Sequence, residues 1–255
     1  MSHFDEKNDN ASNRIEGRNP VIEAIRSGRT IDKILIQSGE KNGSIKKIIA
    51  LARENKIVMT EVDKQRLDKL SVTKSHQGVI AFAAAKEYAD VSDILNLAKQ
   101  KGEKPFIIIA DDLTDPHNLG SVIRTANAAG AHGVIIPKRN SVGLNPVVEK
   151  TSAGALEFMP VARVSNLAST IELLKKENVW VVGADMDGEE TIYTHDFSGA
   201  VAIVVGSEGK GLSRIVKEKC DFIVRIPMHG QINSLNASVA AALMIYEVVR
   251  YRDSI

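Results

Sequence analysis

Three polar stretches of this sequence carry residue types that could bind and orient a substrate. The first, residues 111–126, places Asn118 and Arg124 in a helix that should follow a polar turn. The two residues are six positions apart, which is about 240° around a helix, so they need not share a face. Both could still reach one ligand that crosses the start of the helix, where an amide would orient it and a guanidinium would bind its charge. The alternative is an Asx-type turn followed by a surface arginine.

The second stretch, residues 204–213, combines a glycine-rich turn with a carboxylate. Gly206, Gly209 and Gly211 fall within six residues, and glycine permits unusual backbone angles and close approach of a ligand to main-chain amides. Glu208 lies inside this turn, although a tight turn needs no carboxylate. The pattern indicates a ligand-binding loop, with an ordinary strand-to-helix turn as the alternative.

The third stretch, residues 226–242, joins a strand end to a helix rich in small residues. Pro227 should end the strand, because proline cannot donate to the hydrogen-bond ladder. Ser234 and Asn236 are candidate polar site residues, and either could instead be the N-cap of the helix. Four alanines at 237–242 indicate close packing against another element or a second subunit.

Other common chemistries lack their sequence patterns. No G-x-G-x-x-G follows a predicted strand, and Val205 stands where a Walker-type phosphate loop needs its first glycine. The stretch Asp185-Met186-Asp187-Gly188 lacks the further acidic ligands of a calcium loop. The six histidines show no metal-ligand spacing. Hydride transfer, phosphoryl transfer and zinc-dependent hydrolysis therefore have no support in the sequence.

The elements that would position the three stretches alternate between strand and helix. Continuous apolar runs, which are typical of strands buried on both faces, occur at residues 106–110, 133–136, 179–182, 200–205 and 222–226. Helical patterns lie between most of them, at 118–129, 167–177 and 236–250. This order predicts an α/β domain with a mainly parallel sheet. Each polar stretch begins at or near the carboxyl end of a strand, where open α/β sheets bind ligands.

The first third of the chain predicts a separate and smaller α/β unit. We expect a disordered tail at residues 1–13, an α/β domain at 14–84, a charged and partly helical linker at 85–103 and the parallel-sheet domain at 104–255.

Composition restricts the setting in which this protein works. The formal net charge is +1, so nucleic-acid binding would require a local basic patch. The single cysteine, Cys220, excludes internal disulfides and multi-thiolate metal sites. No apolar run approaches membrane-span length, and the first residues are too polar for a signal peptide. We therefore expect a cytoplasmic protein without a membrane partner.

Taken together, the three stretches resemble, in order and spacing, the motifs of the SpoU class of SPOUT methyltransferases. The resemblance covers about residues 104–255, and residues 14–84 resemble the small L30e-like RNA-binding domain that precedes the catalytic domain in one branch of the class. It implies a trefoil-knotted (α/β-knot) catalytic domain that transfers a methyl group from S-adenosylmethionine to a ribose 2′-hydroxyl without a metal. The closest branch methylates a guanosine in 23S rRNA.

The resemblance also implies the site residues and partners. The catalytic positions would be Asn118, Arg124, Glu208, Ser234 and Asn236, and the cofactor would lie against Gly206, Gly211, Ile226, Met228 and Leu235. Arg124 would act either as a base or as a cation that binds the adjacent phosphate, and the active form would be a homodimer. The family comparison leaves tRNA as an alternative substrate.

RNA contacts would fall to basic residues near the start of the small domain, namely Arg14, Arg18 and Arg26. Aromatic residues make up 4% of the chain, which argues against recognition through stacking platforms. A non-catalytic RNA-binding or ribosome-assembly protein remains an alternative. It would have no need of Asn118, Arg124, Glu208 and Asn236 together.

Overall fold

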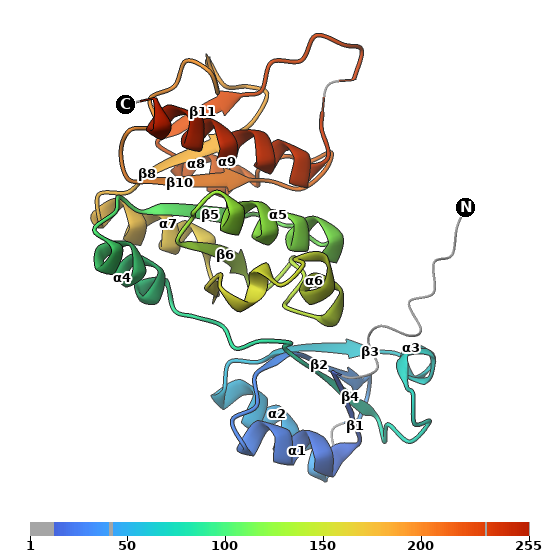
Figure 1. Ribbon diagram of the computed structural model, residues 1–255. Helices are drawn as coiled ribbons and strands as arrows, with labels where there is room; N and C mark the ends of the chain where they lie inside the picture. The colour runs from blue at the N-terminus through green and yellow to red at the C-terminus, as the bar shows by residue number, and fades with distance from the viewer. Residues whose placement is uncertain (1–12, 41–42, 233, 255) are drawn as a thin grey trace. The chain divides into compact units, whose positions relative to one another are not determined.

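The computed structural model describes residues 13–40, 43–232 and 234–254, which form two compact units (Figure 1). Unit 1 contains the described residues up to Glu87 together with Gly143–Val147, and unit 2 contains Tyr88–Val142 and the residues from Val148 onward. The predicted disordered tail lies outside the described residues, except for Asn13. Within the described ranges, no helix combines the length and the apolar character needed to span a membrane.

Unit 1 is built on a four-stranded sheet with the strand order β1-β4-β2-β3. Strand β4 (Val79–Ala83) pairs antiparallel with β1 (Arg14–Glu16) and with β2 (Ile31–Gln37). Strand β3 (Val58–Val62) pairs parallel to β2. A parallel pair needs a crossover connection, and helix α2 (Ser44–Glu54) lies in it.

Helices cover both faces of the unit 1 sheet, because the side chains of its central strands alternate. Ile34 of β2 packs into a core with α2 and with α1 (Arg18–Arg26). Leu35, the next residue, points to the opposite face and packs with Leu67 of α3 (Lys64–Leu70). Both faces of β2 are therefore buried.

Unit 2 contains a seven-stranded sheet with the order β7-β6-β5-β10-β8-β11-β9, and every pairing in it is parallel. This confirms the predicted parallel sheet. The strands are β5 (Phe106–Ala110), β6 (Gly133–Pro137), β7 (Val161–Val164), β8 (Trp180–Ala184), β9 (Glu190–Thr191), β10 (Val201–Val205) and β11 (Phe222–Arg225).

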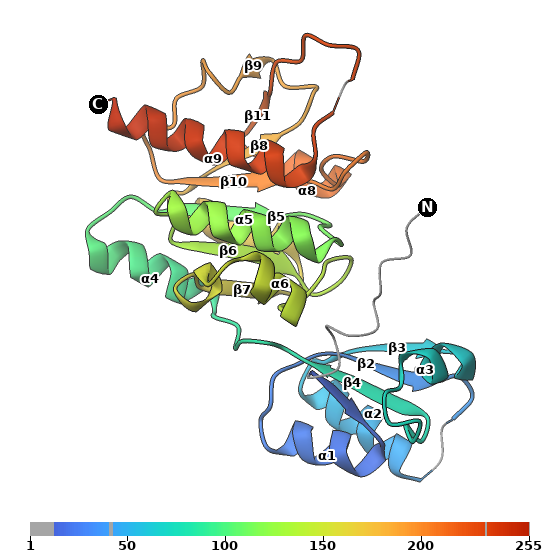
Figure 2. The ribbon, with the colours of Figure 1, turned by 45° about the vertical axis from the view of Figure 1, so that its right-hand side comes forward.

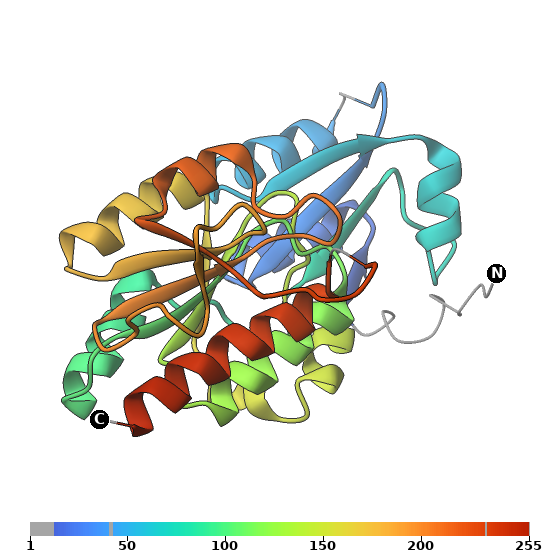
Figure 3. The same cartoon turned by 90° about the horizontal axis from the view of Figure 1, so that it is seen from above.

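The helices from residue 91 onward lie on both sides of this sheet. They are α4 (Val91–Lys101), α5 (Pro116–Ala128), α6 (Pro146–Thr151), the 3-10 helix η1 (Ala155–Glu157), α7 (Leu167–Lys176), α8 (Arg214–Lys219) and α9 (Ala237–Asp253). Helices α5 and α9 lie side by side (Figures 1 and 2). Seen from above, α9 in red lies on one side of the sheet, and α7 and α8 in gold and orange lie on the other (Figure 3).

The segment that we predicted to be a charged and partly helical linker, residues 85–103, contains helix α4. Ile94 and Ala98 of α4 are fully buried, and Ile94 belongs to the core cluster that includes Ile107 of β5. Gly102 ends the helix in the left-handed conformation with φ 67°. The charged residues Asp93, Lys99 and Lys101 of this helix are exposed, because only a narrow stripe of it is apolar.

His132, which precedes β6, is fully buried in unit 2 and uses both ring nitrogens. Its Nδ1 accepts a hydrogen bond from the Phe106 amide at 3.0 Å, so Nε2 carries the ring proton and donates to Glu103 Oε2 at 3.0 Å. Burial lowers the pKa of this imidazole, against the opposing effect of the Glu103 carboxylate. The fold therefore favours the neutral ring.

This arrangement predicts a loss of stability in mild acid. A histidine whose pKa is lower in the folded state contributes its full stability above the unfolded value, about 6.5, and loses that contribution as the pH falls below it. We expect the free energy of unfolding in urea to decline more steeply below that pH for the wild type than for His132→Gln. The same pH dependence in both proteins would contradict the assignment.

Candidate functional site

Four strands of unit 2 end side by side at one edge of the sheet. These strands are neighbours in the order β5-β10-β8-β11, and their carboxyl ends lie along the same edge. The residues that directly follow them are Asp111, Gly206, Asp185 and Ile226. A pocket of about 550 Å³ opens there, within the size range of small-molecule sites. Strands β6 and β7 lie on one side of β5, whereas the later strands β8 to β11 lie on its other side. Open α/β sheets bind ligands where the strand order reverses in this way.

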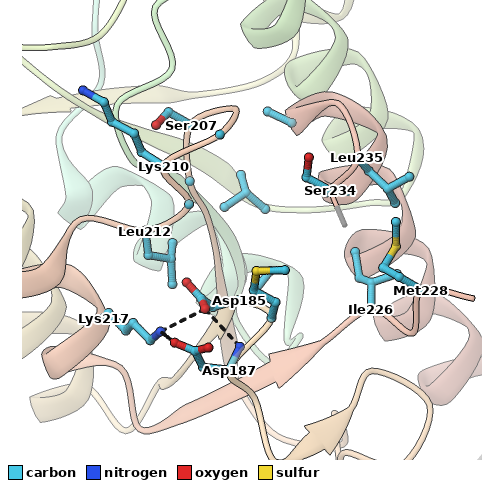
Figure 4. Close-up of a pocket in the computed structure, with 18 of the residues that line it drawn as sticks. Asp185, Asp187, Ser207, Lys210, Leu212, Lys217, Ile226, Met228, Ser234 and Leu235 are labelled. Atoms are coloured by element: carbon cyan, nitrogen blue, oxygen red, sulfur yellow. Dashed lines mark hydrogen bonds and ion pairs between the residues drawn. The ribbon is translucent and has the colours of Figure 1, made fainter. Parts of the chain in front are cut away.

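The pocket has an apolar and a polar side. Ile226, Met228 and Leu235 form the apolar side, with Ser234 beside them (Figure 4). The polar residues that line the other side come from the segments after β8 and β10 and from α8: Asp185, Asp187, Ser207, Lys210 and Lys217. The side chain of Lys210 points away from Ile226, Met228 and Leu235 (Figure 4). All five residues that we predicted to bind a cofactor, Gly206, Gly211, Ile226, Met228 and Leu235, line this pocket.

The glycine-rich loop is closed on itself by two backbone hydrogen bonds. The Ser207 amide donates to the Gly211 carbonyl at 3.1 Å, and the Gly211 amide donates to the Ser207 carbonyl at 3.0 Å. A Cβ atom at Gly206 would lie 2.2 Å from the backbone of Gly211, so no larger residue fits there. Gly209 and Gly211 have φ of 78° and 65°, which glycine adopts without strain. The loop thus has a defined shape.

Glu208 in this loop gathers amide groups from two other motifs. Its Oε1 accepts hydrogen bonds from Asn118 Nδ2 at 3.0 Å, from the Ala237 amide at 3.4 Å and from Asn236 Nδ2. Asn236 Nδ2 also donates to Asn118 Oδ1 at 3.0 Å. Three of the predicted catalytic side chains are therefore in direct contact, and we refer to Asn118, Glu208 and Asn236 as the amide–carboxylate cluster.

Helix starts hold two members of the cluster in place. Asn236 is the N-cap of α9, and its Oδ1 accepts from the amides of Ser238 at 2.9 Å and Val239 at 3.3 Å. Asn118 lies in the first turn of α5, whose N-cap Asp115 accepts from the His117 amide at 2.8 Å. Asn236 is therefore the helix cap, while its Nδ2 atom faces Asn118 and Glu208, and its role in the site stays a prediction.

The remaining two predicted catalytic residues stand apart from the cluster. Arg124 is exposed on α5 and makes no hydrogen bond or ion pair within the described ranges. Ser234 is exposed at the pocket wall. The structure therefore brings together the two asparagines and the glutamate, and leaves a cation and a hydroxyl free nearby on the same motifs.

Two adjacent carboxylates follow β5. Asp111 is buried, and its Oδ2 accepts a hydrogen bond from the Ser213 amide at 2.7 Å, which ties the end of β5 to the start of α8. Asp112 has φ 56°, a left-handed conformation that costs energy in a residue with a side chain. Burial raises the pKa of Asp112, and the charge of Asp111 adds to the effect.

Sequence reasoning missed three charged residues of the pocket. Lys217 on α8 donates to Asp185 Oδ1 at 2.9 Å and to Asp187 Oδ2 at 2.7 Å. These contacts raise the pKa of the lysine, that with Asp187 most. We considered Asp185 and Asp187 as calcium ligands only. Both residues come just after the apolar run at 179–182, which forms a strand of the same sheet. That position could have identified them as residues of the site.

The arginines that we predicted to contact RNA have different surroundings in unit 1. Arg18 pairs with Glu40 at 2.5 Å and donates from Nε to the Gln77 carbonyl at 2.9 Å. Arg14 donates to the Leu70 carbonyl at 2.6 Å. Arg26 is half exposed, with Glu23 at 3.3 Å on the same helix. Arg26 is thus the most accessible of the three.

The single cysteine, Cys220, is partly buried in the fold. Burial raises the pKa of the Cys220 thiol to about 12, so this cysteine stays protonated at neutral pH. The described residues contain no group of three or more histidine, cysteine or acidic side chains that could hold a metal ion.

Comparisons with known proteins agree with this geometry. A model of the SpoU rRNA Methylase family matches residues 105–246, and one described as RNA 2′-O ribose methyltransferase substrate binding matches residues 14–89. Two proteins named for the TrmH family of tRNA/rRNA methyltransferases each cover 94% of this chain and 96% of their own length, one from Bacillus subtilis (48% identical) and one from Staphylococcus saprophyticus (52% identical). The SpoU methyltransferase AviRb from Streptomyces viridochromogenes, solved with AdoMet, has a TM-score of 0.61 at 26% identity, covering 95% of this chain and 91% of its own.

The double role of Asn236 yields a stability prediction. Asn236→Ala removes the cap and should lower the free energy of unfolding by about 1 kcal/mol. Asn236→Ser keeps a capping oxygen but cannot reach Glu208, so it should retain most of that stability. Urea denaturation of both variants measures the difference. Equal losses would show that the contacts with Glu208 and Asn118, and not the cap, stabilise the helix start.

Proposed function

The chain belongs to the SpoU rRNA methylase family of S-adenosylmethionine-dependent RNA methyltransferases, and from this premise we propose that it methylates the ribose 2′-hydroxyl of a guanosine in 23S rRNA. The observation that carries the proposal is the amide–carboxylate cluster beside the pocket. It provides polar groups for an acceptor nucleotide next to space for a cofactor. Such an enzyme would act in the cytoplasm, where ribosomal RNA is located.

The pocket residues fit S-adenosylmethionine. Ile226, Met228 and Leu235 offer an apolar surface for an adenine ring, and the loop from Gly206 to Gly211 presents main-chain groups without side chains in the way. The pocket volume of about 550 Å³ accommodates a ligand of this size. When bound, the cofactor supplies an electrophilic methyl group on a sulfonium, which needs no metal for activation.

The cluster and Arg124 would prepare the ribose for attack. A ribose hydroxyl must lose its proton as it attacks, and a nearby cation stabilises the negative charge that develops on its oxygen. Arg124 is exposed and has no carboxylate partner in the described ranges, so we assign it to the phosphate next to the target ribose. Asn118 and Asn236 would orient the ribose, while Glu208 and Ser234 would fix that arrangement.

Unit 1 would select the RNA. The substrate-binding family model matches residues 14–89, and we propose that residues 14–84 form an L30e-like RNA-binding domain. Phosphate contacts would fall mainly to Arg26 and its neighbour Arg29, both exposed near the end of α1. Arg14 and Arg18 would contribute less, since contacts inside the unit occupy their guanidinium groups.

We further propose that residues 104–255 form the trefoil-knotted methyltransferase domain of this family. The strand order supports this, because β10 enters between β5 and β8 after both have formed their own helix connections. Helix α9 then returns to lie beside α5. A late strand in the centre of the sheet and a final helix beside an early one are both consistent with a knotted path.

The alternative substrate is tRNA, because the relatives carry both substrates in their names. The substrate-binding unit favours ribosomal RNA. A non-catalytic RNA-binding protein is the other alternative, and the cluster argues against it, since binding alone requires no carboxylate that orients two amides beside a cofactor-sized pocket.

Transfer of a radiolabelled methyl group from S-adenosylmethionine tests the proposed function. We expect label in unmodified 23S rRNA but not in tRNA, and we expect the labelled site to resist alkaline cleavage, because a methylated 2′-oxygen cannot attack the adjacent phosphodiester. Arg124→Ala should lower the rate by about two orders of magnitude, as when one charge-stabilising group is lost. Lys176→Ala, which removes an exposed cation of α7, should have no effect.

Each other outcome has a distinct meaning. Label in tRNA alone would keep the chemistry and overturn the substrate. Label in a base, released as a methylated nucleobase, would overturn the ribose assignment. Binding of the cofactor without transfer to either RNA would favour the non-catalytic alternative, unless a ribosome-assembly intermediate accepts the label.

Helix α9 supports a second proposal, that the active form is a homodimer. Val239, Leu243 and Tyr246 are 47%, 39% and 51% exposed and follow one another at helical spacing. Such a stripe on a helix that already packs against α5 would be buried most simply by a second copy of the chain.

A charge in this stripe should separate the subunits. Leu243→Glu would place a carboxylate in the buried interface without a partner, so the protein should sediment as a monomer. Leu173→Glu is the matched control, since Leu173 is 46% exposed on α7 at the opposite side of the sheet. Analytical ultracentrifugation compares the two. A dimeric Leu243→Glu protein, or a monomeric wild type, would contradict the proposed interface.

A further inference from the structure

A lysine and two carboxylates form a charged group on the polar side of the pocket, opposite Ile226, Met228 and Leu235 (Figure 4). Lys217 Nζ lies 2.9 Å from Asp185 Oδ1 and 2.7 Å from Asp187 Oδ2. The Asp185 side chain is only 12% exposed, whereas that of Asp187 is 76% exposed. Asp185 is therefore the mostly buried carboxylate of the group, and it lines the pocket.

The sheet order fixes where Asp185 lies along the pocket. Strand β8 pairs with β10 on one side and with β11 on the other. Asp185 follows β8 directly, just as Gly206 follows β10 and Ile226 follows β11. A ligand held at both Gly206 and Ile226 must therefore pass over Asp185.

The two oxygens of Asp185 are used differently. Oδ1 accepts hydrogen bonds from Lys217 Nζ at 2.9 Å and from the Asp187 amide at 3.1 Å. No donor among the described residues reaches Oδ2. That oxygen lies toward Gly211, where a Cβ atom would come within 3.2 Å of it. Glycine at 211 thus leaves one face of a mostly buried carboxylate oxygen open to the pocket.

The neighbouring charges restrict what can bind to this oxygen. A carboxylate accepts hydrogen bonds, so the ligand must supply a donor. A second ammonium group would be repelled by Lys217, whose charge lies 2.9 Å from the same carboxylate. A ligand carboxylate would be repelled by Asp185 and Asp187. Neutral hydroxyl donors meet neither penalty, and vicinal hydroxyls occur on the ribose of adenosine.

We propose that Asp185 binds the ribose diol of the cofactor's adenosine through its free Oδ2, with Lys217 and Asp187 as positioning residues. This inference rests on the proposed function, because it assumes an adenosine-containing cofactor. Lys217 holds the carboxylate in one orientation and offsets its charge. Asp185 would thereby select a ribonucleoside cofactor and fix its position between Gly206 and Ile226.

Binding calorimetry with S-adenosylhomocysteine and its 2′-deoxy and 3′-deoxy analogues tests the proposal without any methyl transfer. A hydrogen bond to a charged acceptor corresponds to about a tenfold change in affinity. The wild type should therefore bind at least one deoxy analogue about tenfold more weakly than the parent compound. Asp185→Ala should bind all three compounds with nearly equal, reduced affinity.

Two further variants separate binding from folding. Asp221→Ala is a matched control, because Asp221 pairs with Lys175 at 2.7 Å, is 13% exposed and lies outside the pocket. It should keep the wild-type preference for the ribose compound. Asp185→Asn keeps the shape of the side chain and a neutral acceptor oxygen, so the protein should fold. It should retain only a small preference for S-adenosylhomocysteine over the deoxy analogues. Lys217→Met should weaken the preference by releasing the carboxylate.

The outcomes distinguish this inference from the proposed function. A wild type that binds S-adenosylhomocysteine but does not discriminate against either deoxy analogue would overturn the role of Asp185. The same holds if Asp185→Ala or Asp185→Asn keeps the full preference. A wild type that binds neither S-adenosylmethionine nor S-adenosylhomocysteine would overturn the proposed function itself.

Discussion

The contact of one carboxylate with two amides is the interaction on which the site depends. Asn118 and Glu208 are 90 residues apart in the sequence, and Asn118 and Asn236 are 118 apart, yet one glutamate oxygen accepts from both asparagines. Hydrogen bonds to an ionised acceptor are stronger than those between neutral groups. Glu208 is exposed, so water weakens its contribution to stability, and its main effect is to give the two amides one relative orientation. The glycine-rich loop supplies the position of Glu208, because two backbone hydrogen bonds between Ser207 and Gly211 close it.

The cluster can form because parallel strands end together. Residues that follow β5, β10, β8 and β11 meet at one edge although the chain reaches them in a different order. The backbone adds its own constraint at Gly206, where any side chain would collide with Gly211. The same loop therefore closes by two backbone hydrogen bonds and directs Glu208 toward α5 and α9. Fold and site are linked through this turn.

The sequence alone could predict the buried strands and the three polar motifs, since continuous apolar runs and clustered glycines are local features. It could not predict the edge strands β1, β7 and β9, which are short and half polar. The resemblance to the SpoU class implied that Asn118, Glu208 and Asn236 act together, but their contacts depend on sheet order. Arg18 shows the limit of reading charges from sequence: its partner Glu40 lies 22 residues away and is brought close by the fold of unit 1.

The balance of charge in the pocket follows from the reaction that the family performs. A sulfonium carries a full positive charge before methyl transfer, and that charge disperses as the transition state forms. An unpaired carboxylate beside it would stabilise the starting state more than the transition state and so slow the reaction. Lys217 pairs with Asp185 and Asp187, and the amides of Asn118 and Asn236 engage Glu208, so these three carboxylates each have a hydrogen-bonded partner. These carboxylates can then orient ligands through hydrogen bonds. Their hydrogen-bonded partners offset part of the negative charge that would otherwise stabilise the sulfonium before methyl transfer.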